Sequence, residues 1–406
     1  MAERPLRAVL VERATPRLVE LLAAALEGTG PAIWPLDAGL PAGRIAELIA
    51  ALRPGSIEDA EGVSPVRSVQ QEGVAEGTAV VVGTSGSTGA PKGVELSAAA
   101  LRHSARASLD RVGARAGQRW LCCLPVTHVA GLQVLVRSLV SGTEPVLAGR
   151  ADAGTVAAGA ASGCAHVSLV PTQLQRLLAG GGLAGPAALA GYSSVLLGGA
   201  AAPTPLLAAA RAAGVPVVTT YGMTETCGGC VYDGVPLDGV RVEIRDDGRI
   251  WIGGPVLFSG YRGGPRAPGD GWFRTGDLGR LDSSGRLTVR GRADDVINTG
   301  GHKVVPGEVA AVLAACPGVR DVAVVGQPDP EWGERVVAVV VPADPADPPA
   351  PELLRLRVRE RLPRYAAPSK VVTVDAVPIL PNGKHDLVRL RLELLRREQT
   401  EAENVT

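Results

Sequence analysis

Short apolar runs alternate with helical stretches through the middle of this 406-residue chain. Each run is about four to eight residues long, which suits a buried strand and is too short for a typical helix. The expected strands lie within residues 78–89, 119–125, 165–171, 192–199 and 215–222, and residues 96–113 are expected to form a helix. Strands that alternate with helices predict an α/β fold with mixed or parallel sheets.

The first 75 residues have a different pattern. Residues 18–28 and 42–55 have helical spacing and end at Gly or Pro-Gly. Because Gly and Pro stop helices, we expect two helices here. The rest of residues 1–75 is expected to form loops.

The pattern changes again after residue 235. Turns such as Asp247-Gly248 and Ser284-Gly285 join short apolar runs, which predicts a small antiparallel β-rich region at about 235–293. From residue 294 the order helix, strand, strand, helix, strand predicts a compact α+β unit. We therefore expect a large N-terminal domain at 1–293 and a small C-terminal domain at 294–406.

The overall charge excludes some classes of protein. Lys and Arg number 41 and Asp and Glu number 41, so the chain lacks the basic excess of a nucleic-acid-binding protein. No apolar run reaches the roughly 18–20 residues that span a bilayer, and the charged N-terminus is unlike a secretory signal. We expect a cytoplasmic protein. Cys227 and Cys230 form one isolated CxxC, for which small buried residues are a better interpretation than a metal or redox site.

Residues 84–93 carry the strongest local signal for chemistry. These ten positions contain three Gly, four residues with hydroxyl groups and one cation, Lys92. Such a loop offers backbone N–H groups and hydroxyls to a polyphosphate, although it is not a Walker A loop. The chain has only four Lys, at 92, 303, 370 and 384. Because Lys is a compact point charge, a Lys retained in an Arg-rich chain is a candidate phosphate ligand.

Residues 84–94 resemble the phosphate loop of the adenylate-forming enzymes, which include acyl- and aryl-CoA synthetases, luciferases and peptide-synthetase adenylation domains. The other motifs of that family follow in order, at residues 221–225, 275–277, 291–301 and 381–384. The resemblance implies an ATP- and Mg²⁺-dependent enzyme that forms an acyl-AMP and transfers the acyl group to a thiol such as coenzyme A. It also implies a mobile C-terminal domain.

The resemblance further implies roles for individual residues. ATP binding is implied for Thr84, Ser85, Gly86, Ser87, Thr88, Gly89, Lys92, Gly199, Ala200, Tyr221, Gly222, Met223, Thr224, Asp277, Arg292 and Lys384. Catalysis is implied for Lys384, Thr224, Glu225 and His128, with Glu225 also as the Mg²⁺ ligand. Acid binding is implied for His128, Arg137, Gly198, Gly199, Gly222 and Met223, CoA contact for Gly300 and Gly301, and the domain hinge at Asp294. Attack of a carboxylate on the α-phosphate builds negative charge, which calls for cations and N–H donors.

The nine-residue separation of His128 and Arg137 resembles that in the o-succinylbenzoate–CoA ligases of menaquinone biosynthesis. Their substrate is an aromatic dicarboxylic acid that keeps one carboxylate after activation. A buried carboxylate needs a partner, and Arg can bind it bidentately. On one continuous helix the two residues would lie on opposite faces, so the helix has to begin after His128 for them to converge.

Several alternatives stay open at this point. The acid can be another aryl or acyl substrate, the acyl acceptor can be a carrier protein, and the chain can be a nucleotide sensor without turnover. Arg137 can instead be a surface charge on a helix. The phosphate loop starts early, at residue 84, so we expect a shortened N-terminal region. Lys384 is followed by His385-Asp386, a departure that we expect an exposed C-terminal tail to tolerate. The sequence leaves open whether the chain forms a homodimer.

Overall fold

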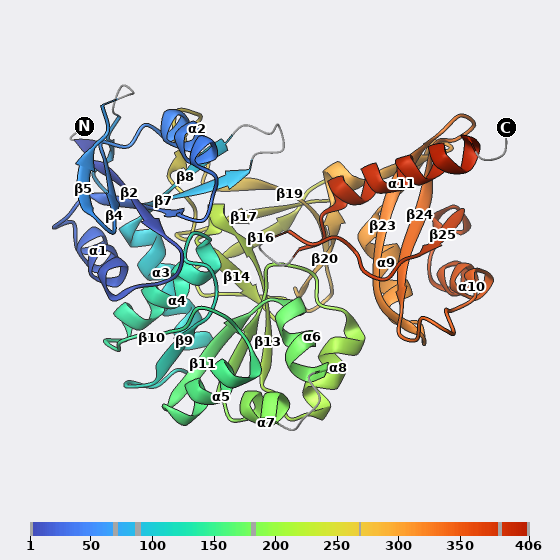
Figure 1. Ribbon diagram of the computed structural model, residues 1–406, viewed down its shortest axis with the longest axis horizontal. Helices are drawn as coiled ribbons and strands as arrows, with labels where there is room; N and C mark the ends of the chain where they lie inside the picture. The colour runs from blue at the N-terminus through green and yellow to red at the C-terminus, as the bar shows by residue number, and fades with distance from the viewer. Residues whose placement is uncertain are drawn as a thin grey trace. The chain divides into compact units, whose positions relative to one another are not determined.

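The structure is a computed structural model (Figure 1) and describes residues 3–67, 72–85, 91–179, 184–267, 269–380 and 384–403. The chain forms two compact units. The first comprises Met1–Gly199, Ala210–Glu243 and Trp251–Phe273, and the second comprises Ala200–Ala209, Ile244–Ile250 and Arg274–Thr406. The second unit thus takes in part of the β-rich region, and the functional boundary at residue 294 stays a prediction.

A seven-stranded sheet has the order β10-β9-β11-β12-β13-β14-β15. Its strands are β9 (Arg119–Cys122), β10 (Val146–Leu147), β11 (Cys164–Leu169), β12 (Ser194–Leu197), β13 (Val217–Met223), β14 (Gly228–Tyr232) and β15 (Val235–Pro236). The strands from β10 to β13 are parallel, and β14 and β15 join antiparallel. This arrangement confirms the predicted α/β fold with a mixed sheet.

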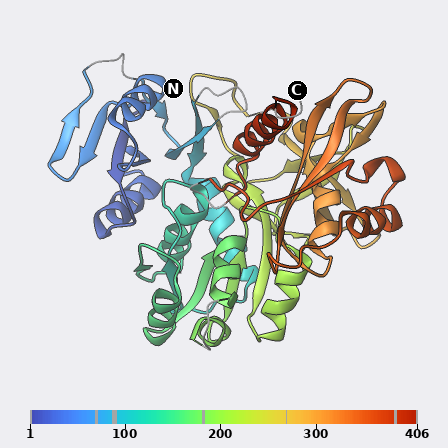
Figure 2. The same ribbon diagram turned by 45° about the vertical axis from the view of Figure 1, so that its right-hand side comes forward.

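Helices surround these strands in Figures 1 and 2. They are α3 (Ala98–Arg111), α4 (Val129–Val140), α5 (Ala153–Ala161), α6 (Pro171–Ala179), α7 (Ala184–Ala190) and α8 (Thr204–Ala212). Helix α4 packs on β9, β11 and β14, and α5 packs on β11. The predicted helix at 96–113 is confirmed as α3, whose N-cap Ser97 accepts from the backbone N–H of Ala100.

A second seven-stranded sheet has the order β18-β8-β7-β3-β2-β4-β5. Its strands are β2 (Leu6–Val11), β3 (Ala32–Asp37), β4 (Ser56–Asp59), β5 (Gly62–Pro65), β7 (Thr78–Ser85), β8 (Pro91–Ser97) and β18 (Gly260–Tyr261). A separate pair, β1 (Glu3–Arg4) and β6 (Val74–Ala75), forms a two-stranded sheet.

The prediction of only helices and loops in residues 1–75 was therefore wrong. Both predicted helices are present, as α1 (Pro16–Glu27) and α2 (Ala42–Leu52), but strands β1 to β6 were missed. Strands β2 and β3 are parallel neighbours, and β3 is buried at five of its six residues. A strand covered on both faces has no alternating pattern, and Arg7 and Pro35 interrupt the two apolar runs.

The predicted β-rich region is a four-stranded sheet with the order β16-β17-β19-β20. Its strands are β16 (Arg241–Ile244), β17 (Arg249–Gly253), β19 (Trp272–Leu281) and β20 (Leu287–Arg292). Strands β19 and β20 pair antiparallel, with Asp277 directly opposite Arg292. The short strand β18 leaves this region and pairs with β8.

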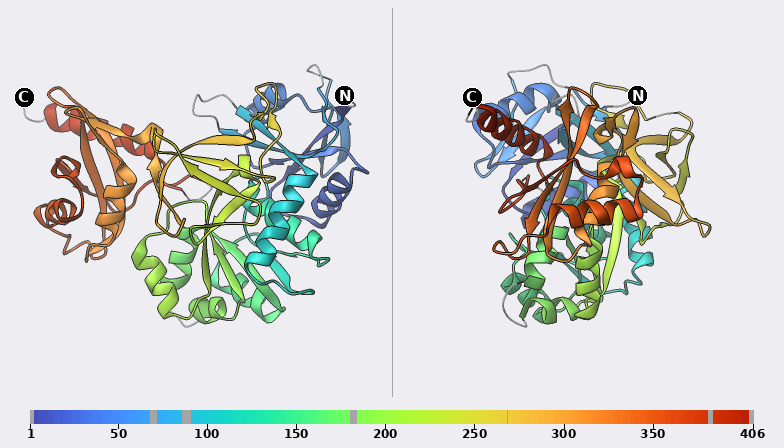
Figure 3. Two further views of the ribbon diagram at one scale, coloured as in Figure 1. Left: turned by 180° about the vertical axis from the view of Figure 1, so that it is seen from behind. Right: turned by 90° about the vertical axis from the view of Figure 1, so that its right-hand side faces the viewer.

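The C-terminal region folds around a sheet of β21 (Ile297–Thr299), β22 (His302–Val304), β23 (Val319–Asp329), β24 (Gly333–Pro342) and β25 (Lys370–Thr373). Successive residues of β23 enter different cores. Val322 and Val324 pack with helices α9 (Pro306–Ala314) and α10 (Pro351–Arg361), whereas Ala323 and Val325 pack with α11 (Leu387–Glu403). This alternation, expected for a strand covered on both faces, leaves the sheet between its helices in Figure 3.

We expected the C-terminal tail to be exposed, but part of it is buried. Leu390 and Leu394 of α11 are buried against the sheet, and His385 pairs with Asp321 at 3.0 Å. Among the described residues, no helix is both long enough and apolar enough to cross a membrane.

Candidate active site

The phosphate loop connects the antiparallel strands β7 and β8. The register places Thr84 opposite Lys92 and Ser85 opposite Pro91. The Thr84 hydroxyl donates to the Lys92 carbonyl at 3.4 Å. Gly86, Ser87, Thr88 and Gly89 lie outside the described residues. The hairpin thus brings the first hydroxyl of the loop and its Lys to the same end of two strands.

Thr224 and Glu225 lie on a short 3-10 helix, η1 (Thr224–Thr226), between β13 and β14. The Thr226 hydroxyl accepts from the Met223 N–H and donates to the Gly228 carbonyl, which closes the turn. At Gly222 a side chain would collide with that carbonyl, so only Gly permits this close approach. Tyr221, Gly222 and Met223, which complete this motif, are the last residues of β13.

The turn is also held at Cys227, which follows η1 and has a φ of 53° in the left-handed region. Its carbonyl accepts hydrogen bonds from the Ser104 hydroxyl at 3.2 Å and the Gln133 amide at 2.8 Å. Ser104 belongs to α3 and Gln133 to α4. Two helices therefore hold in place a conformation that a non-Gly residue rarely adopts.

Glu225 has one polar partner that the sequence did not reveal. The Tyr261 hydroxyl donates to Glu225 Oε1 at 2.9 Å. Burial and the Glu225 charge raise the pKa of Tyr261, so the phenol stays protonated and remains a donor. The described residues contain no cluster of three His, Cys, Asp or Glu that would bind a metal by themselves.

The turn after β12 contains Gly198, Gly199 and Ala200. A side chain at Gly198 would collide with the Thr220 hydroxyl on the neighbouring strand β13, and Gly199 has a φ of 84°. Both positions therefore require Gly, which lets the backbone turn at the carboxyl end of the sheet. In open α/β sheets, ligands bind outside the carboxyl ends of the strands.

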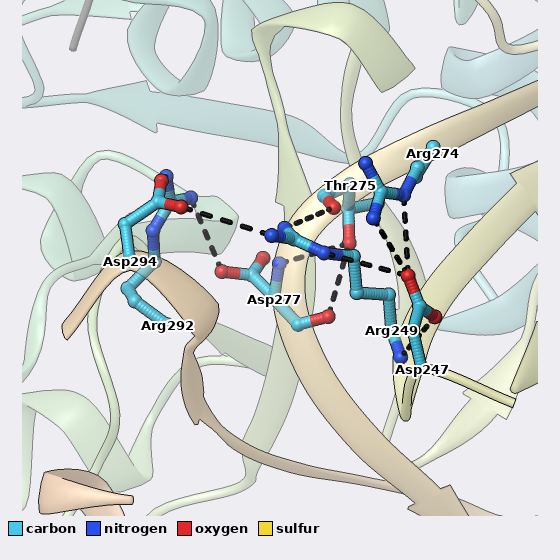
Figure 4. Close-up of polar contacts among 7 residues, drawn as sticks. All are labelled: Asp247, Arg249, Arg274, Thr275, Asp277, Arg292 and Asp294. Carbon is cyan, nitrogen blue, oxygen red and sulfur yellow. Dashed lines mark hydrogen bonds and ion pairs between the residues drawn. The ribbon is translucent and has the colours of Figure 1, made fainter. Parts of the chain in front are cut away.

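Asp277 and Arg292 form an ion pair across β19 and β20 (Figure 4). Arg292 Nη1 lies 3.2 Å from Asp277 Oδ1. The Asp277 N–H donates to the Thr275 hydroxyl, which in turn donates to the Ile250 carbonyl. A Cβ at Gly276 would lie only 2.6 Å from the Arg292 guanidinium. Each residue of the Thr-Gly-Asp motif therefore has its own structural role: Thr275 provides the hydroxyl, Gly276 leaves space for Arg292, and Asp277 provides the carboxylate.

Asp294 lies on the 3-10 helix η2 (Ala293–Asp295), directly after Arg292. Its carboxylate faces two guanidinium groups, with Arg292 Nη2 at 3.5 Å and Arg249 Nη2 at 3.8 Å. Figure 4 shows Arg249 reaching from β17 toward both Asp294 and the Thr275 carbonyl. Asp294 is half-exposed, so these pairs are not locked in a dry core.

Lys384 shares its electrostatic environment with Asp277 and Arg292. Although the residue is exposed, desolvation by nearby protein atoms lowers the pKa of Lys384. The Asp277 carboxylate opposes that shift, and the Arg292 charge adds to it. The Lys384 carbonyl accepts from the Leu380 N–H at 2.7 Å. Residues 381–383 of this motif lie outside the described residues.

Gly300 and Gly301 form the two-residue turn of the β21–β22 hairpin, in which Thr299 pairs with His302. Their φ angles are 55° and 80°. Two positive φ values are what a tight hairpin turn of the primed type requires, which explains the Gly pair. The Gly300 N–H donates to the Trp332 carbonyl at 2.9 Å.

Helix α4 begins at Val129, with His128 as its N-cap residue. The condition set by the sequence, a helix that begins after His128, is therefore met. The two side chains still differ in environment, because His128 is exposed and Arg137 is only 5% exposed. Nine residues of α-helix separate them by about 13 Å along the axis. The structure does not bring His128 and Arg137 together.

The Arg137 guanidinium lies in a buried polar and aromatic environment. Its Nη2 donates to the Ser168 hydroxyl at 3.0 Å, and its central carbon lies 4.3 Å from the centroid of the Trp120 ring. Its Nε has no hydrogen-bond partner in the part of the chain that the structure describes. No carboxylate of the described residues forms an ion pair with Arg137, which rules out a surface helix charge and marks an unneutralised buried cation.

His166 also stacks on Trp120, with 4.6 Å between the two ring centroids. Burial and then the Arg137 charge lower the pKa of His166 to about 4. Its ring nitrogens lie 2.8 Å from the Ser194 hydroxyl and 3.1 Å from Gln118 Oε1. The imidazole is therefore neutral near pH 7.

Comparison with known proteins places the chain among its relatives. A sequence model described as AMP-binding enzyme matches residues 42–262, and one described as AMP-binding enzyme C-terminal domain matches residues 308–384. The chain belongs to the AMP-binding enzyme family. The mixed α/β fold with a smaller C-terminal α+β region agrees with this assignment.

Individual members of the AMP-binding enzyme family are similar over most of the chain. The probable 2-succinylbenzoate–CoA ligase of Mycobacterium tuberculosis is 47% identical over 350 residues, 82% of this chain and 88% of that protein. The 2-succinylbenzoate–CoA ligase of Bacillus licheniformis is 34% identical over 388 residues, covering 86% and 79%. A solved o-succinylbenzoate CoA synthetase (MenE) from Bacillus subtilis, in complex with the acyl-adenylate intermediate OSB-AMP, superposes with a TM-score of 0.79, 28% identity and coverage of 97% and 88%.

The CxxC of this AMP-binding enzyme has the properties of buried structural residues. Cys227 and Cys230 are both fully buried. Burial raises the pKa of both thiols, that of Cys230 to about 12. Because the thiolate is the reactive and metal-binding form, thiols in this environment are unreactive. The favoured interpretation from the sequence agrees with these observations.

Proposed function

We propose that the chain is an ATP- and Mg²⁺-dependent 2-succinylbenzoate–CoA ligase of menaquinone biosynthesis, acting in the cytoplasm. In the first step the succinyl carboxylate attacks the α-phosphorus of ATP, which forms the acyl-AMP and releases pyrophosphate. In the second step the CoA thiol attacks the acyl carbon, which forms the thioester and releases AMP and a proton. The family, the close relatives and the arrangement of the motif residues support this proposal.

In the first step, hydrogen-bond donors and cations stabilise the charge on the phosphates. The loop at residues 84–92 binds the β- and γ-phosphates through backbone N–H groups, hydroxyls and Lys92. Thr224 binds the α-phosphate, Asp277 accepts the ribose hydroxyls beside Arg292, and Tyr221 stacks on adenine. Lys384 neutralises charge on the α-phosphate and orients the attacking carboxylate. Burial by nearby protein atoms lowers the pKa of Lys384, and the Asp277 carboxylate opposes that shift by favouring the charged ammonium.

Glu225 is the residue that fits Mg²⁺. Magnesium is bound through one or two carboxylates together with substrate phosphates and water, and it does not require an all-protein cage. A single half-buried carboxylate on η1, with no larger acidic cluster among the described residues, matches that mode. When bound, the ion neutralises charge on the phosphate oxygens.

The second step requires a rotation at Asp294. The Asp294 carboxylate is 58% exposed, and its partners Arg292 and Arg249 are 50% and 21% exposed, so both ion pairs remain in contact with water and cost little to break. After rotation, the Gly300–Gly301 turn replaces Lys384 near the acyl group and contacts the pantetheine arm. Domain alternation of this hinge type lets one site perform two reactions.

The observation that carries the choice of acid is the buried Arg137 cation. A carboxylate that stays on the aromatic ring of the substrate would supply its missing anion and would accept from the unpartnered Nε. A monocarboxylic aryl or fatty acid would leave the cation unneutralised. Gly198, Gly199, Gly222 and Met223 line the acyl path in this proposal, and His128 acts at its entrance.

The proposal is tested by incubating the purified protein with ATP, Mg²⁺, CoA and a panel of acids. The panel holds 2-succinylbenzoate, benzoate, a hydroxybenzoate and fatty acids of medium and long chain, and products are identified by mass. The proposal predicts a thioester formed mainly from 2-succinylbenzoate. A thioester formed mainly from another acid overturns the assignment of the substrate. AMP release only with a phosphopantetheinyl carrier protein overturns the assignment of CoA.

A further inference from the structure

Tyr261 contacts two groups of the proposed nucleotide site with two different parts of its side chain. Its hydroxyl donates to Glu225 Oε1 at 2.9 Å. The Lys92 ammonium lies above its ring, 5.5 Å from the centroid. Glu225 comes from η1 and Lys92 from β8, so one side chain links the proposed metal ligand to the proposed phosphate ligand.

The backbone around Tyr261 fixes this position. Tyr261 lies on β18 and pairs with Val94 of β8, two residues after Lys92. The preceding Gly260 has a φ of 152°, and a Cβ there would lie 2.8 Å from the Arg266 backbone, so the chain can turn into β18 only with Gly.

A second contact connects the same segment to Glu225. The Phe258 N–H donates to the Glu225 carbonyl at 2.9 Å. The Phe258 ring meets the Tyr261 ring edge-on, with 4.9 Å between centroids. The segment at 258–261 therefore holds both the backbone and the side chain of Glu225.

The chemistry of these contacts suits a metal–phosphate site. A Glu side chain has three rotatable bonds, and a hydrogen bond to Oε1 fixes its rotamer while Oε2 keeps its lone pairs for a metal. An ammonium above an aromatic face is attracted by the ring quadrupole. That attraction positions the Lys without using any acceptor oxygen, so its N–H donors stay available to phosphate.

We propose that Tyr261 is a positioning residue for the metal and phosphate side of the site, with its hydroxyl orienting Glu225 and its ring holding Lys92. This inference rests on the roles proposed above for Glu225 and Lys92. Tyr261 itself touches neither substrate nor metal in this scheme. Loss of the hydroxyl contact and loss of the ring contact should therefore affect Mg²⁺-dependent and Mg²⁺-free ATP binding separately.

The test measures ATP binding by isothermal titration calorimetry, with and without Mg²⁺, alongside the Mg²⁺ concentration for half-maximal activity. Tyr261→Phe keeps the ring and removes the hydroxyl. A hydrogen bond to a charged group corresponds to about tenfold in an equilibrium constant. We expect about tenfold loss of the Mg²⁺-dependent gain in ATP affinity and a similar rise in the Mg²⁺ requirement, with Mg²⁺-free ATP binding unchanged. Tyr261→Leu should also weaken Mg²⁺-free binding, because Lys92 loses its ring.

Tyr192→Phe is the matched control, because the Tyr192 hydroxyl likewise donates a hydrogen bond, at 2.8 Å to the Val156 carbonyl, and is buried. It should leave both binding measurements unchanged, and thermal unfolding should show that all variants fold. Glu225→Gln separates the two levels of the proposal. If Glu225→Gln abolishes the Mg²⁺-dependent gain and Tyr261→Phe leaves it intact, the role of Tyr261 is overturned. If Glu225→Gln also leaves it intact, Glu225 is not the metal ligand, and the roles proposed for Glu225 and for Tyr261 both fail.

Discussion

The guanidinium of Arg137 lies 4.3 Å above the Trp120 ring, in a part of the first unit where no described carboxylate neutralises it. A buried charge held by an aromatic face and one hydroxyl is poorly compensated, because cation–π contacts recover only about 0.5–2 kcal/mol. A protein keeps such a group when another molecule supplies the counter-ion. The Arg137–Trp120 pair therefore connects the stability of the fold to the proposed choice of substrate.

Replacement of Arg137 by Leu should not destabilise the protein. Replacing a buried, poorly paired charge by an apolar residue is often neutral or stabilising by about 1–4 kcal/mol. The thermal unfolding midpoint of Arg137→Leu should equal or exceed that of the wild type, while activity with 2-succinylbenzoate falls.

Arg262→Leu provides the contrast for this measurement. Arg262 is also buried, but its donors bond the carbonyls of Leu52, Arg53, Glu72 and Gly73, and it lies 3.6 Å from Glu95. Its loss should cost about 3–5 kcal/mol, because those groups lose their partner. A large destabilisation by Arg137→Leu would mean that this cation is structural.

His166 should make the protein less stable in acid. Its pKa is lowered to about 4 in the fold, by burial and then by Arg137, against about 6.5 when unfolded. Between these values the unfolded chain binds the extra proton, so stability falls as the pH drops from about 6.5 to 4 and is unaffected above that window. The loss amounts to about 3 kcal/mol.

Thermal unfolding from pH 8 to pH 4 checks this contribution by comparing the wild type with His166→Gln. The variant lacks the titrating ring, so its stability relative to the wild type should rise as the pH falls through this window. Parallel curves for the two proteins would show that His166 does not contribute.

Lys384 should matter for one half-reaction more than for the other. Lys384→Ala should slow formation of the acyl-AMP by about 100-fold or more, which is the usual cost of removing one electrostatic stabiliser. Thioester formation from supplied acyl-AMP should fall much less. Lys370→Ala is the matched control, because Lys370 pairs with Glu398 at 3.1 Å in the same unit. Equal losses in both half-reactions would contradict the role assigned to Lys384.

Gly276→Ala should disturb the ribose side of the site without unfolding the chain. The added Cβ would lie 2.6 Å from the end of the Arg292 side chain, which can move away at little cost. Arg292 should then leave Asp277, and the KM for ATP should rise about tenfold, as for a lost hydrogen bond to a charged group. Gly43→Ala on α2 is the control, because its Cβ would meet nothing within 4 Å. An unchanged KM in Gly276→Ala would contradict the importance of the Asp277–Arg292 pair.

The sequence predicted those parts of the structure that depend on local patterns. Strands β7, β9 and β11 to β13 were predicted because each contains a short, mainly apolar run next to a helical stretch, and the Gly-rich motifs mark turns that require Gly. Tyr261 was missed as a partner of Glu225 because 36 residues separate them and nothing in the order of residues shows the pairing of β18 with β8.

The same reason explains the other partners that were missed. Trp120, Ser168 and His166 surround Arg137 from strands β9 and β11, and Arg249 reaches Asp294 from β17. Strands β2 and β3 were missed because Arg7 and Pro35 interrupt their apolar runs, and burial on both faces leaves no alternation that could mark them instead. The spacing of His128 and Arg137 left open whether the two side chains converge, because their different burial depends on the packing of α4 and is not visible in the sequence.

The most direct test of the account compares two acids in two proteins. 2-Succinylbenzoate and 4-oxo-4-phenylbutanoate differ only in the ring carboxylate that Arg137 is proposed to bind. In the wild type, kcat/KM for thioester formation should be at least about 100-fold higher for 2-succinylbenzoate, as for a charge-assisted pair of about 3 kcal/mol. In Arg137→Leu this ratio should fall to near one, with the KM for ATP unchanged. A ratio that stays high in the variant would contradict the central claim, because another residue would then recognise the second carboxylate.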